Sequence, residues 1–566
     1  MTTMPGSINR ARIFRAMLLG CTLAALAMPV QAREAKEASA KDEAPRQKSR
    51  TADGARTSVT PYLEVSQAVF AELSPGSDVL TYTNLAAGVE AEIAGRNTQG
   101  AVSLRYERRI GWGKNDPDGD VISGLARVAS QIVPGTLRID AGALAARTRI
   151  DGSGGTTLNP LISSGDNSSQ IYSFYAGSTL TTHAGDVALA ASYRAGYTRV
   201  EDPKGFRSSP GVPAVDIVDD TLNQIATVSA GVRPGDVLPV GVTASAGWAR
   251  EDISNLDQRI DEKYGRLDFV FPVSLDVALL AGVGYENVEI SSRDVLRDAN
   301  GLPVIGRNGR LRTDKSAPRQ LAYDVEGLIY DAGVMWRPSR RTALEAHVGK
   351  RYGSTSVYGS FAYAPDARSS FNVSVYDNVA GFGSTVRRAL EDLSTDFETS
   401  RNPLTGDLNG CVIAQANGTC LNSALSSVAA ATFRARGVSA SYNLTLGRIN
   451  AGIGAGYDRR KFIAAPGTVL AAANGVIDEN TFVAGYLGAR LDQQSSISAN
   501  IYANWFNSGL STAGDATAVG ANASYFRRLT NRLTASAAVG IDGIEREDPF
   551  IDQWGATALV GLRYSL

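Results

Sequence analysis

The chain has 566 residues, a formal net charge of −1 and 43% apolar residues. A net charge near zero excludes the basic footprint of a nucleic-acid-binding protein, and it also excludes a strongly acidic, solvating chain. The 58 glycines and 21 tyrosines, set against only 2 histidines and 5 methionines, favour closely packed β-structure over a helical or metal-rich enzyme.

The first 32 residues have the organisation of a secretory signal peptide. Three arginines, the last of them Arg15, precede an apolar run that ends at Val30, and Ala32 occupies the cleavage position. An alternative is a lipoprotein signal ending at Cys21, but only five residues separate Arg15 from that cysteine, too few for an apolar core. The sequence therefore predicts a signal peptide over residues 1–32.

Residues 33–60 form a polar segment in which 12 of 28 residues are charged, with both signs mixed. Apart from alanine, Val59 is its one aliphatic residue. Such a segment cannot bury enough apolar surface to offset the entropy lost on ordering. We expect a disordered periplasmic linker.

From residue 61 to the end, apolar and polar residues alternate in strand-length segments. In one example, Leu137 and Ile139 share one face while Arg138 and Asp140 share the other. The same period of two recurs in later segments such as 449–458. This alternation is typical of strands that have one apolar and one wet face.

The connections between these segments come in two sizes. Short turns such as "RPGD", "RPSRR" and "LTNR" alternate with long connections, the longest of them over residues 378–430. Short periplasmic turns opposite longer external loops are typical of transmembrane β-barrels. The sequence predicts an all-β, antiparallel transmembrane barrel over residues 61–566 in the bacterial outer membrane, with about 22 strands (range about 18 to 24).

A soluble β-sandwich or propeller would also alternate. Its apolar face, however, would have to fill a core with large side chains, whereas here that face mixes alanine and valine with leucine and tyrosine. The opposite face carries charged residues such as Arg194, Asp268 and Glu345, which are tolerable only if that face is wet. A propeller would also need a blade repeat of about 40 residues, and none recurs.

The C-terminal pattern resembles the signature that the barrel assembly machinery recognises. Leu562, Tyr564 and Leu566 are apolar residues at alternate positions. Most such proteins end in phenylalanine, so the final leucine is a departure. We expect these three residues to act as the assembly signal, with the assembly machinery and outer-membrane lipid as partners.

Three stretches near the start of the barrel carry a family resemblance: "TPYLEVSQAVFAEL", "YTNLAAGVEAEI" and "VSLRYERRIGWG". They resemble the opening hairpins of uncharacterised outer-membrane barrels from sphingomonad-type Alphaproteobacteria. Those barrels are similar to ones associated with exopolysaccharide and PEP-CTERM protein-sorting clusters. The resemblance implies a barrel and a link to polysaccharide, and it carries over no catalytic residue.

The sequence offers few parts for catalysis. An outer-membrane hydrolase needs a serine, a histidine base and an orienting polar group. His183 falls in a predicted periplasmic turn, while His347 alternates with Glu345 and so faces the lumen. We expect no enzymatic activity and no cofactor.

The alternating acids Asp116, Asp118 and Asp120 could bind Ca²⁺ through oxygen atoms. An EF-hand would need an acid at the twelfth position, and that residue is Arg127. We interpret this stretch as an acidic external turn and expect no metal site.

The long connection over residues 378–430 contains a helical pattern. Val386, Leu390, Leu393 and Phe397 follow helical spacing, and Ser384 or Thr385 is available as a cap. Four charged residues lie elsewhere around this helix and are our candidates for a pore constriction: Arg387, Arg388, Glu391 and Asp392. The alternative is a surface loop that packs over the barrel rim.

The same connection contains Cys411 and Cys420, the two cysteines that remain after signal-peptide removal. In an exported chain, two cysteines nine positions apart predict a local disulfide. A metal site is the alternative, although no histidine or second cysteine pair lies nearby.

Two functions remain open at this stage. The first is a passive or polymer-exporting pore for polar solutes or exopolysaccharide, since polar lumen faces and rings of charge set selectivity in such channels. The second is a non-transporting surface barrel that acts as a scaffold or adhesion platform through its long loops. The lumen could be wide or narrowed by loops that fold inward, because no N-terminal plug segment is recognisable.

Overall fold

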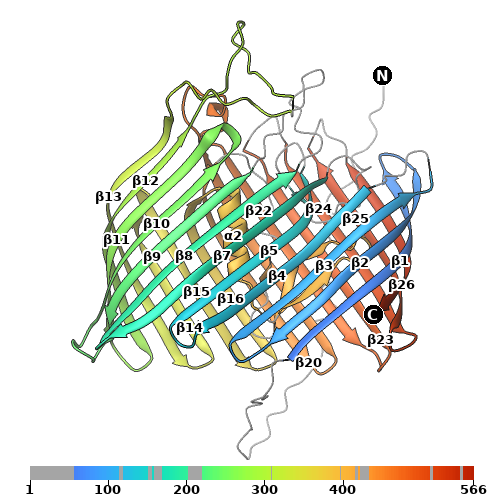
Figure 1. Cartoon of the computed structure of the whole chain (residues 1–566), viewed down its shortest axis with the longest axis horizontal. Helices are drawn as coiled ribbons and strands as arrows, with labels where there is room; N and C mark the ends of the chain where they lie inside the picture. The colour runs from blue at the N-terminus through green and yellow to red at the C-terminus, as the bar shows by residue number, and fades with distance from the viewer. Residues whose placement is uncertain are drawn as a thin grey trace, which may run out of the picture. The chain divides into compact units, whose positions relative to one another are not determined.

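The computed structural model is a closed antiparallel β-barrel of 22 wall strands (Figure 1). It describes residues 56–113, 119–150, 156–157, 168–201, 220–307, 309–395, 397–414, 419–420, 432–509, 514–547 and 552–566. The first wall strand pairs with the last, so the sheet has no free edge. This closure confirms the predicted fold class.

The wall strands, in chain order, are β1 (Arg56–Ser74), β2 (Val79–Ala94), β3 (Thr98–Gly111), β4 (Gly119–Val133), β5 (Leu137–Ile150), β7 (Ser168–Ala184), β8 (Val187–Glu201), β9 (Thr221–Val232), β10 (Gly241–Ile253), β11 (Gln258–Pro272), β12 (Val277–Ser292), β13 (Gln320–Ser339), β14 (Thr342–Arg351), β15 (Ser354–Asp366), β16 (Ser369–Ala380), β20 (Thr432–Leu446), β21 (Ile449–Ile463), β22 (Ile477–Arg490), β23 (Ser495–Asn507), β24 (Ala516–Arg528), β25 (Leu533–Arg546) and β26 (Gln553–Ser565).

Only a few further elements interrupt the wall. They are the short strand β6 (Thr156–Thr157), the helix α2 (Phe382–Glu391), the strands β17 (Phe397–Arg401), β18 (Leu408–Ala414) and β19 (Thr419–Cys420), and the 3₁₀ turns η2 (Asn255–Asp257) and η3 (Ala471–Ala473). Among the described residues, no helix has the length and apolar character that a membrane crossing needs.

The barrel begins slightly earlier than its pattern suggests. Strand β1 starts at Arg56, which lies opposite Ala94 of β2, so the last residues of the predicted linker belong to the wall. Residues 56–60 are mostly polar, so their sequence alone does not predict a strand. Their backbone hydrogen bonds to β2 stabilise the strand conformation. The predicted signal peptide and the rest of the linker lie outside the described residues.

The two ends of the barrel differ as predicted. One end has short turns, such as Arg340–Arg341 between β13 and β14, and the other has long loops, such as residues 293–319 between β12 and β13 (Figure 1). We call them the short-turn rim and the long-loop rim. Three connections at the long-loop rim are themselves short: residues 75–78 between β1 and β2, the turn with η2 between β10 and β11, and Tyr352–Gly353 between β14 and β15.

Large apolar side chains cover the outer face of the wall. Val539 on β25 and Val560 on β26, for example, are 59% and 61% exposed there. The polar residues that alternate with such side chains along the strands point inward. Three outward tyrosines, Tyr106, Tyr285 and Tyr457, donate hydrogen bonds of 2.8–3.0 Å to a carboxylate on a neighbouring strand. Tyrosines with an apolar ring below and a polar partner above are typical of the membrane interface.

Strand β26 closes the barrel against β1. Leu562 lies opposite Val65, and Tyr564 lies opposite Leu63. Leu562, Tyr564 and Leu566 are all exposed on the outer face, as the alternation predicts. Their role in assembly stays a prediction.

Candidate functional site in the barrel interior

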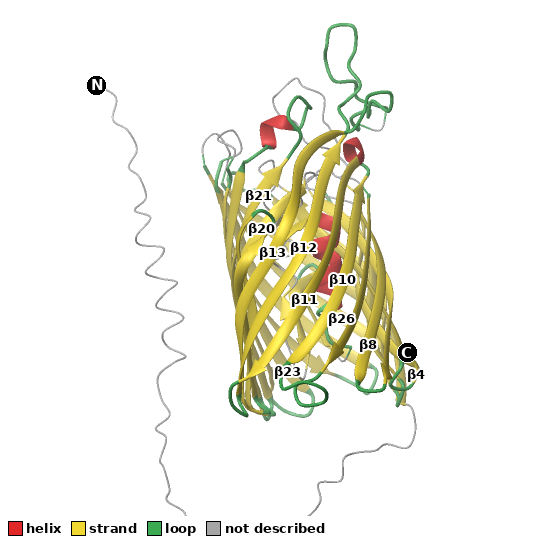
Figure 2. Ribbon diagram, turned by 90° about the vertical axis from the view of Figure 1, so that its left-hand side faces the viewer, coloured by secondary structure: helices red, strands yellow, loops and turns green. Residues whose placement is uncertain are grey.

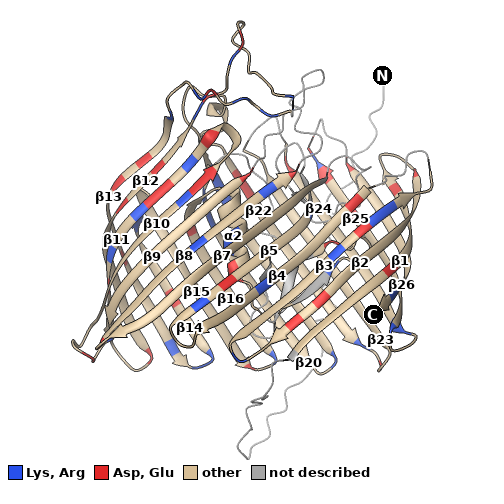
Figure 3. Ribbon diagram, in the orientation of Figure 1, with Lys and Arg blue, Asp and Glu red and all other residues tan. Residues whose placement is uncertain are grey.

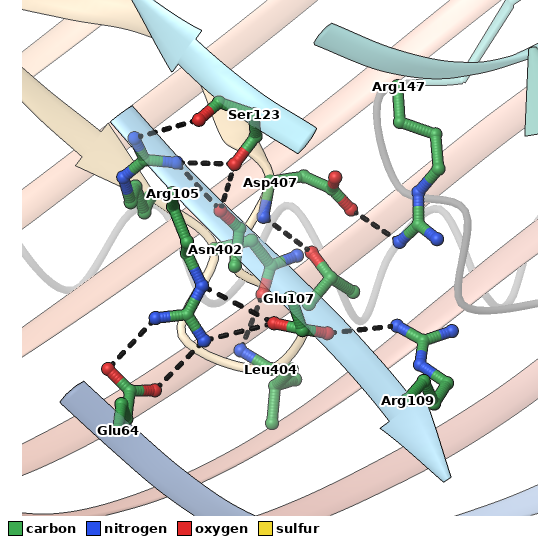
Figure 4. A network of polar contacts seen from close by, with 12 residues as sticks. Glu64, Arg105, Glu107, Arg109, Ser123, Arg147, Asn402, Leu404 and Asp407 are labelled. Carbon is green, nitrogen blue, oxygen red and sulfur yellow. Dashed lines mark hydrogen bonds and ion pairs between the residues drawn. The ribbon is translucent and has the colours of Figure 1, made fainter. Parts of the chain in front are cut away.

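The inner wall carries a network of paired charges (Figure 4). The guanidinium of Arg105 on β3 donates two hydrogen bonds to Glu64 on β1, of 2.9 and 3.0 Å, and a third of 2.9 Å to Glu107. Arg109 lies 3.5 Å from the other oxygen of Glu107. These residues alternate along the strand and so all face inward, where pairing compensates the cost of their partial burial.

A compact turn from the β16–β20 connection packs against this network. The backbone N–H of Asn402 donates to Asp407 O at 2.8 Å, and the side chain of Asn402 accepts the N–H of Leu404 at 3.0 Å. Gly406 has a φ of +71°. A Cβ atom there would lie 2.6 Å from Nε of Arg105, so only glycine allows this close approach.

Two charged residues anchor the turn to the wall. Nη2 of Arg147, on β5, donates to Oδ2 of Asp407 at 2.8 Å. Arg401 donates to the Ser103 and Ser123 hydroxyls, at 2.8 and 2.6 Å respectively. Each contact joins a wall strand to a residue that is more than 250 positions away in the chain, so the turn is held from two sides.

Helix α2 packs on the inner wall through its apolar face (Figure 2). Val386 and Leu390 are fully buried, and Leu393 and Phe397 are 4% and 6% exposed. The wall contributes small and apolar inward residues to this cluster: Ala101, Leu125, Leu144, Ala146, Ile171, Tyr175 and Val200. Burial of each large side chain contributes about 1.5–3 kcal/mol, so this contact is the main attraction between α2 and the wall.

Charged wall residues complement both ends of α2. The carboxylate of Glu251, on β10, accepts the N–H of Gly381 at 2.8 Å and that of Ser384 at 3.0 Å. At the other end, Arg127 on β4 donates to the carbonyl oxygens of Glu391 at 3.3 Å and Leu393 at 3.4 Å. An anion at the first turn and a cation at the last turn both oppose the helix dipole.

The described residues of the range 381–414 therefore form a luminal segment, and we use this name for them below. Apart from a contact of Arg388 with β16, from which the segment leaves the wall, its contacts follow eleven consecutive wall strands: β25, β26, β1, β2, β3, β4, β5, β7, β8, β9 and β10. The two alternatives left by the sequence, an inward fold and a lid over the rim, are thus resolved for these residues in favour of the inward fold.

The four residues predicted to form a constriction lie on α2 and just after it. Arg387 is 5% exposed and pairs with Glu391, whose carboxylate also lies 3.5 Å from Arg194 of β8. Arg388 donates to the side chain of Asn378 at 3.0 Å. Asp392 is exposed. Their role in narrowing a pore stays a prediction.

The helix differs from its prediction at its start. Ser384 and Thr385 are not its caps, because the helix begins at Phe382 with Gly381 as the N-cap, and Glu251 supplies the side-chain acceptor. A Cβ atom on Gly383 would collide with the side chain of Thr221 on β9, so the glycines allow the helix start to approach the wall.

The two cysteines lie opposite each other in the small sheet formed by β17, β18 and β19. Strand β18 pairs with β19 in a register that places Cys411 against Cys420. Directly opposed residues of an antiparallel pair have Cα atoms about 4.5–5.5 Å apart, which is within the range that a disulfide spans. The disulfide itself stays a prediction.

The histidine considered for catalysis lies in a carboxylate cluster. Nδ1 of His347 lies 2.9 Å from Asp331, Nε2 lies 3.2 Å from Glu345, and the ring stacks on Tyr358 at 4.7 Å. Both ring nitrogens are engaged by carboxylates, and no serine contacts them among the described residues. The expected lack of enzymatic activity stays a prediction.

The acidic stretch considered for Ca²⁺ is only partly described, because Asp116 and Asp118 lie outside the described residues. Asp120 lies 3.0 Å from Arg108 on the neighbouring strand. The described part of the chain contains no group of three or more residues arranged to hold a metal ion.

Sequence reasoning missed the residues that hold the luminal segment, namely Glu251, Arg147, Arg401 and Asp407. The alternation shows that Arg147 and Glu251 face inward, but it does not show what they face. The tight turn "NPLTGD" at residues 402–407 was a recognisable local signal, since asparagine, proline and glycine are turn residues.

No protein-family model matches the chain, and no curated protein matches it. Solved structures with some similarity include the FrpB iron transporter from Neisseria meningitidis (F5-1 variant), with 10% identity, a TM-score of 0.40, and coverage of 89% of this chain and 82% of that one. The closed form of the ferric-catecholate import receptor Fiu from E. coli K12 has 10% identity and a TM-score of 0.41, with coverage of 89% and 82%. The copper transporter OprC has 11% identity and a TM-score of 0.38, with coverage of 90% and 80%. Similarity at this level indicates no shared substrate or mechanism.

Proposed function

We propose that the protein is an outer-membrane channel for polar solutes, in which the luminal segment narrows the passage. The observation that carries this proposal is the course of the luminal segment along eleven of the 22 wall strands. A barrel of this strand number encloses a wide interior unless something occupies it. A segment held on one side of the wall narrows that interior and gives it a charged edge.

Part of the other half of the wall favours hydroxyl-rich solutes, although that half also carries inward ion pairs such as Arg266 with Asp331. Its inward side chains include neutral hydrogen-bonding pairs, such as Tyr486 with Asn443 at 3.0 Å and Asn500 with Asn522 at 3.0 Å. Side chains that both donate and accept hydrogen bonds suit sugars better than ions. We therefore propose small sugars or a neutral exopolysaccharide as the transported class, which agrees with the polysaccharide link that the family resemblance implies.

Conductance across a planar bilayer tests the proposal. The full-length barrel should open ion-conducting channels, and a variant with residues 384–420 replaced by a short glycine-serine linker should conduct more. A matched control replaces the external loop 293–319 by the same linker and should leave the conductance unchanged. Silence of both the full-length barrel and the luminal deletion would reject a channel.

A surface scaffold is the second candidate, and the loop layer at the long-loop rim favours it. Asp294 in the 293–319 loop accepts the N–H of Val469 from the loop between β21 and β22 at 2.8 Å, so two loops form one surface. Silent bilayers, together with binding of whole cells that is lost on replacement of the 293–319 loop, would support the scaffold over the channel.

A further inference from the structure

Arginine is concentrated on one arc of the short-turn rim. Five adjacent turns form this basic arc, and they join β13 to β14, β15 to β16, β20 to β21, β22 to β23 and β24 to β25. Within three residues of these turns lie nine arginines and two acidic residues: Arg337, Arg340, Arg341, Arg368, Arg448, Arg490, Arg527, Arg528 and Arg532, with Asp366 and Asp492. Figure 3 shows basic residues at this end of the barrel.

The rest of the short-turn rim has no such excess. The other five turns, counted in the same way, contain three arginines and four acidic residues: Arg96, Arg138 and Arg233, with Glu92, Asp186, Asp236 and Asp276. The formal charge is therefore +7 on the basic arc and −1 on the remaining turns. A general preference for arginine in turns would spread the positive charge over all ten turns and would not confine it to the basic arc.

The guanidinium groups of the basic arc are exposed, and eight of the nine have no carboxylate within ion-pair distance among the described residues. All nine arginines are exposed. Among the described residues, Arg337 is the only one of the nine with a carboxylate within the ion-pair distance, that of Glu345 at 4.0 Å. Others donate to oxygens of the adjacent turn, as Arg448 does to Leu491 O at 3.3 Å. These contacts hold the arc together without neutralising it.

Outward aromatic residues lie just above the basic arc. Trp336, Tyr363, Tyr442 and Tyr525 are 37–42% exposed near the lower ends of their strands. The hydroxyl of Tyr525 lies 3.4 Å from Nη1 of Arg527, which follows it on the same face. Because aromatic residues of this kind mark the membrane interface, the arginines lie at the level of the lipid headgroups.

We propose that the basic arc binds the phosphate groups of anionic phospholipids in the membrane leaflet that faces the short-turn rim. The guanidinium group can donate two parallel hydrogen bonds to a phosphate, and the carbonyl contacts leave other N–H groups available. Lipid is favoured over an acidic protein because the charges adjoin the lipid-facing aromatic residues. The proposal needs the membrane-spanning barrel but does not depend on the channel.

Native mass spectrometry of the purified full-length barrel, exchanged into mixed micelles of phosphatidylglycerol and phosphatidylcholine, tests the proposal. The wild-type barrel should retain phosphatidylglycerol selectively. The triple variant Arg340→Gln, Arg368→Gln, Arg532→Gln should bind it about 10- to 100-fold more weakly, because each arginine near a lipid surface contributes measurably to the attraction. A lysine version of the triple variant should keep most of the binding.

The matched control is the triple variant Arg96→Gln, Arg138→Gln, Arg233→Gln, which removes the same charge from the rest of the rim and should bind as wild type. Heat-dependent gel mobility shows that each variant is folded. Equal retention by the arc variant and wild type would overturn the proposal, and so would an equal loss in the control. Polyglutamate serves as a probe for an acidic protein. If the arc variant bound polyglutamate less well but retained lipid like wild type, the proposal would also be overturned, and the arc would be assigned to an acidic protein partner.

Discussion

Glu251 on β10 and Arg127 on β4 hold opposite ends of the same helix, although 124 residues of sequence separate them. Glu251 accepts the first N–H groups of the helical turn, and Arg127 donates to carbonyl oxygens at its end. The wall thus supplies both caps of α2, while the helix sequence supplies only its apolar face. Docking of α2 therefore depends on wall residues that never contact each other.

Glu251→Ala should loosen the start of α2. The substitution leaves the buried N–H of Gly381 without its acceptor, which costs about 1–3 kcal/mol. Hydrogen exchange of the α2 amides should become faster in the variant while exchange of the wall strands stays unchanged. Glu251→Gln is the matched control, because it keeps one acceptor oxygen and should show a smaller effect. Equal exchange in all three proteins would contradict the capping role.

Asp407→Ala should release the turn at residues 402–407. Breaking a buried ion pair by removing one partner costs about 3–5 kcal/mol, since Arg147 would keep an uncompensated charge. Spin labels attached near the turn should report greater mobility in this variant. The double variant Arg147→Met, Asp407→Leu should restore much of the order, because it removes both charges together. A double variant as mobile as the single one would show that the pair itself is not the anchor.

Gly406→Ala should disturb the same turn through backbone strain and a steric contact, without any change of charge. Alanine at a positive φ costs about 1–2 kcal/mol, and here its Cβ would also lie 2.6 Å from Arg105. Gly447→Ala is a matched control, since Gly447 has a φ of +58° but no atom within 4 Å of the added Cβ. Hydrogen exchange at the amides of the substituted turn should accelerate more in Gly406→Ala than in Gly447→Ala. Similar behaviour of the two variants would attribute the effect to backbone strain.

The contact between the two external loops should weaken in acid. Burial alone would raise the pKa of Asp294, but hydrogen bonds from the N–H groups of Val295 and Val469 and from Arg297 outweigh it, and its pKa lies below the ordinary value of 3.8. A lowered pKa stabilises the contact above pH 3.8, and this contribution is lost as the pH falls through the native pKa.

Spin labels on Leu302 and Ala472 measure this contact directly. Their distance distribution should be narrow at pH 7 and should broaden below pH 3.8. Asp294→Asn should give a broad distribution at both pH values, because the amide cannot carry the charge that these donors stabilise. A wild-type distribution that does not change with pH would remove Asp294 as the link.

Much of the fold could be read from the sequence because a barrel wall has a simple period. The alternation around Asp140 places that residue inward, and in the structure it is 3% exposed and pairs with Arg127 at 3.0 Å. The apolar face of Val386 and Leu390 is likewise visible in the sequence. The period of the sequence, however, shows which face of the element a residue occupies, but it does not show which residue it contacts.

The anchors of the luminal segment could not be read in this way. Arg147 and Asp407 are 260 residues apart, and their contact depends on the register of several strands and on the path of a long connection. The sequence of that connection fits both a lid and an inward fold, because its apolar residues could pack on either surface. The choice depends on the inner wall, whose charged groups and spaces between side chains match those of the segment.

The burial of Leu404 depends on the closure of the barrel. It is fully buried among Ala68 and Phe70 of β1, Tyr82 of β2, Ala538 of β25 and Leu559 of β26. Because these strands come from the two ends of the chain, this pocket exists only after the first and last strands have met. The Glu251 cap needs no such event. The Leu404 contact therefore requires a closed barrel, whereas the Glu251 cap does not, so burial of Leu404 reports that the first and last strands are paired.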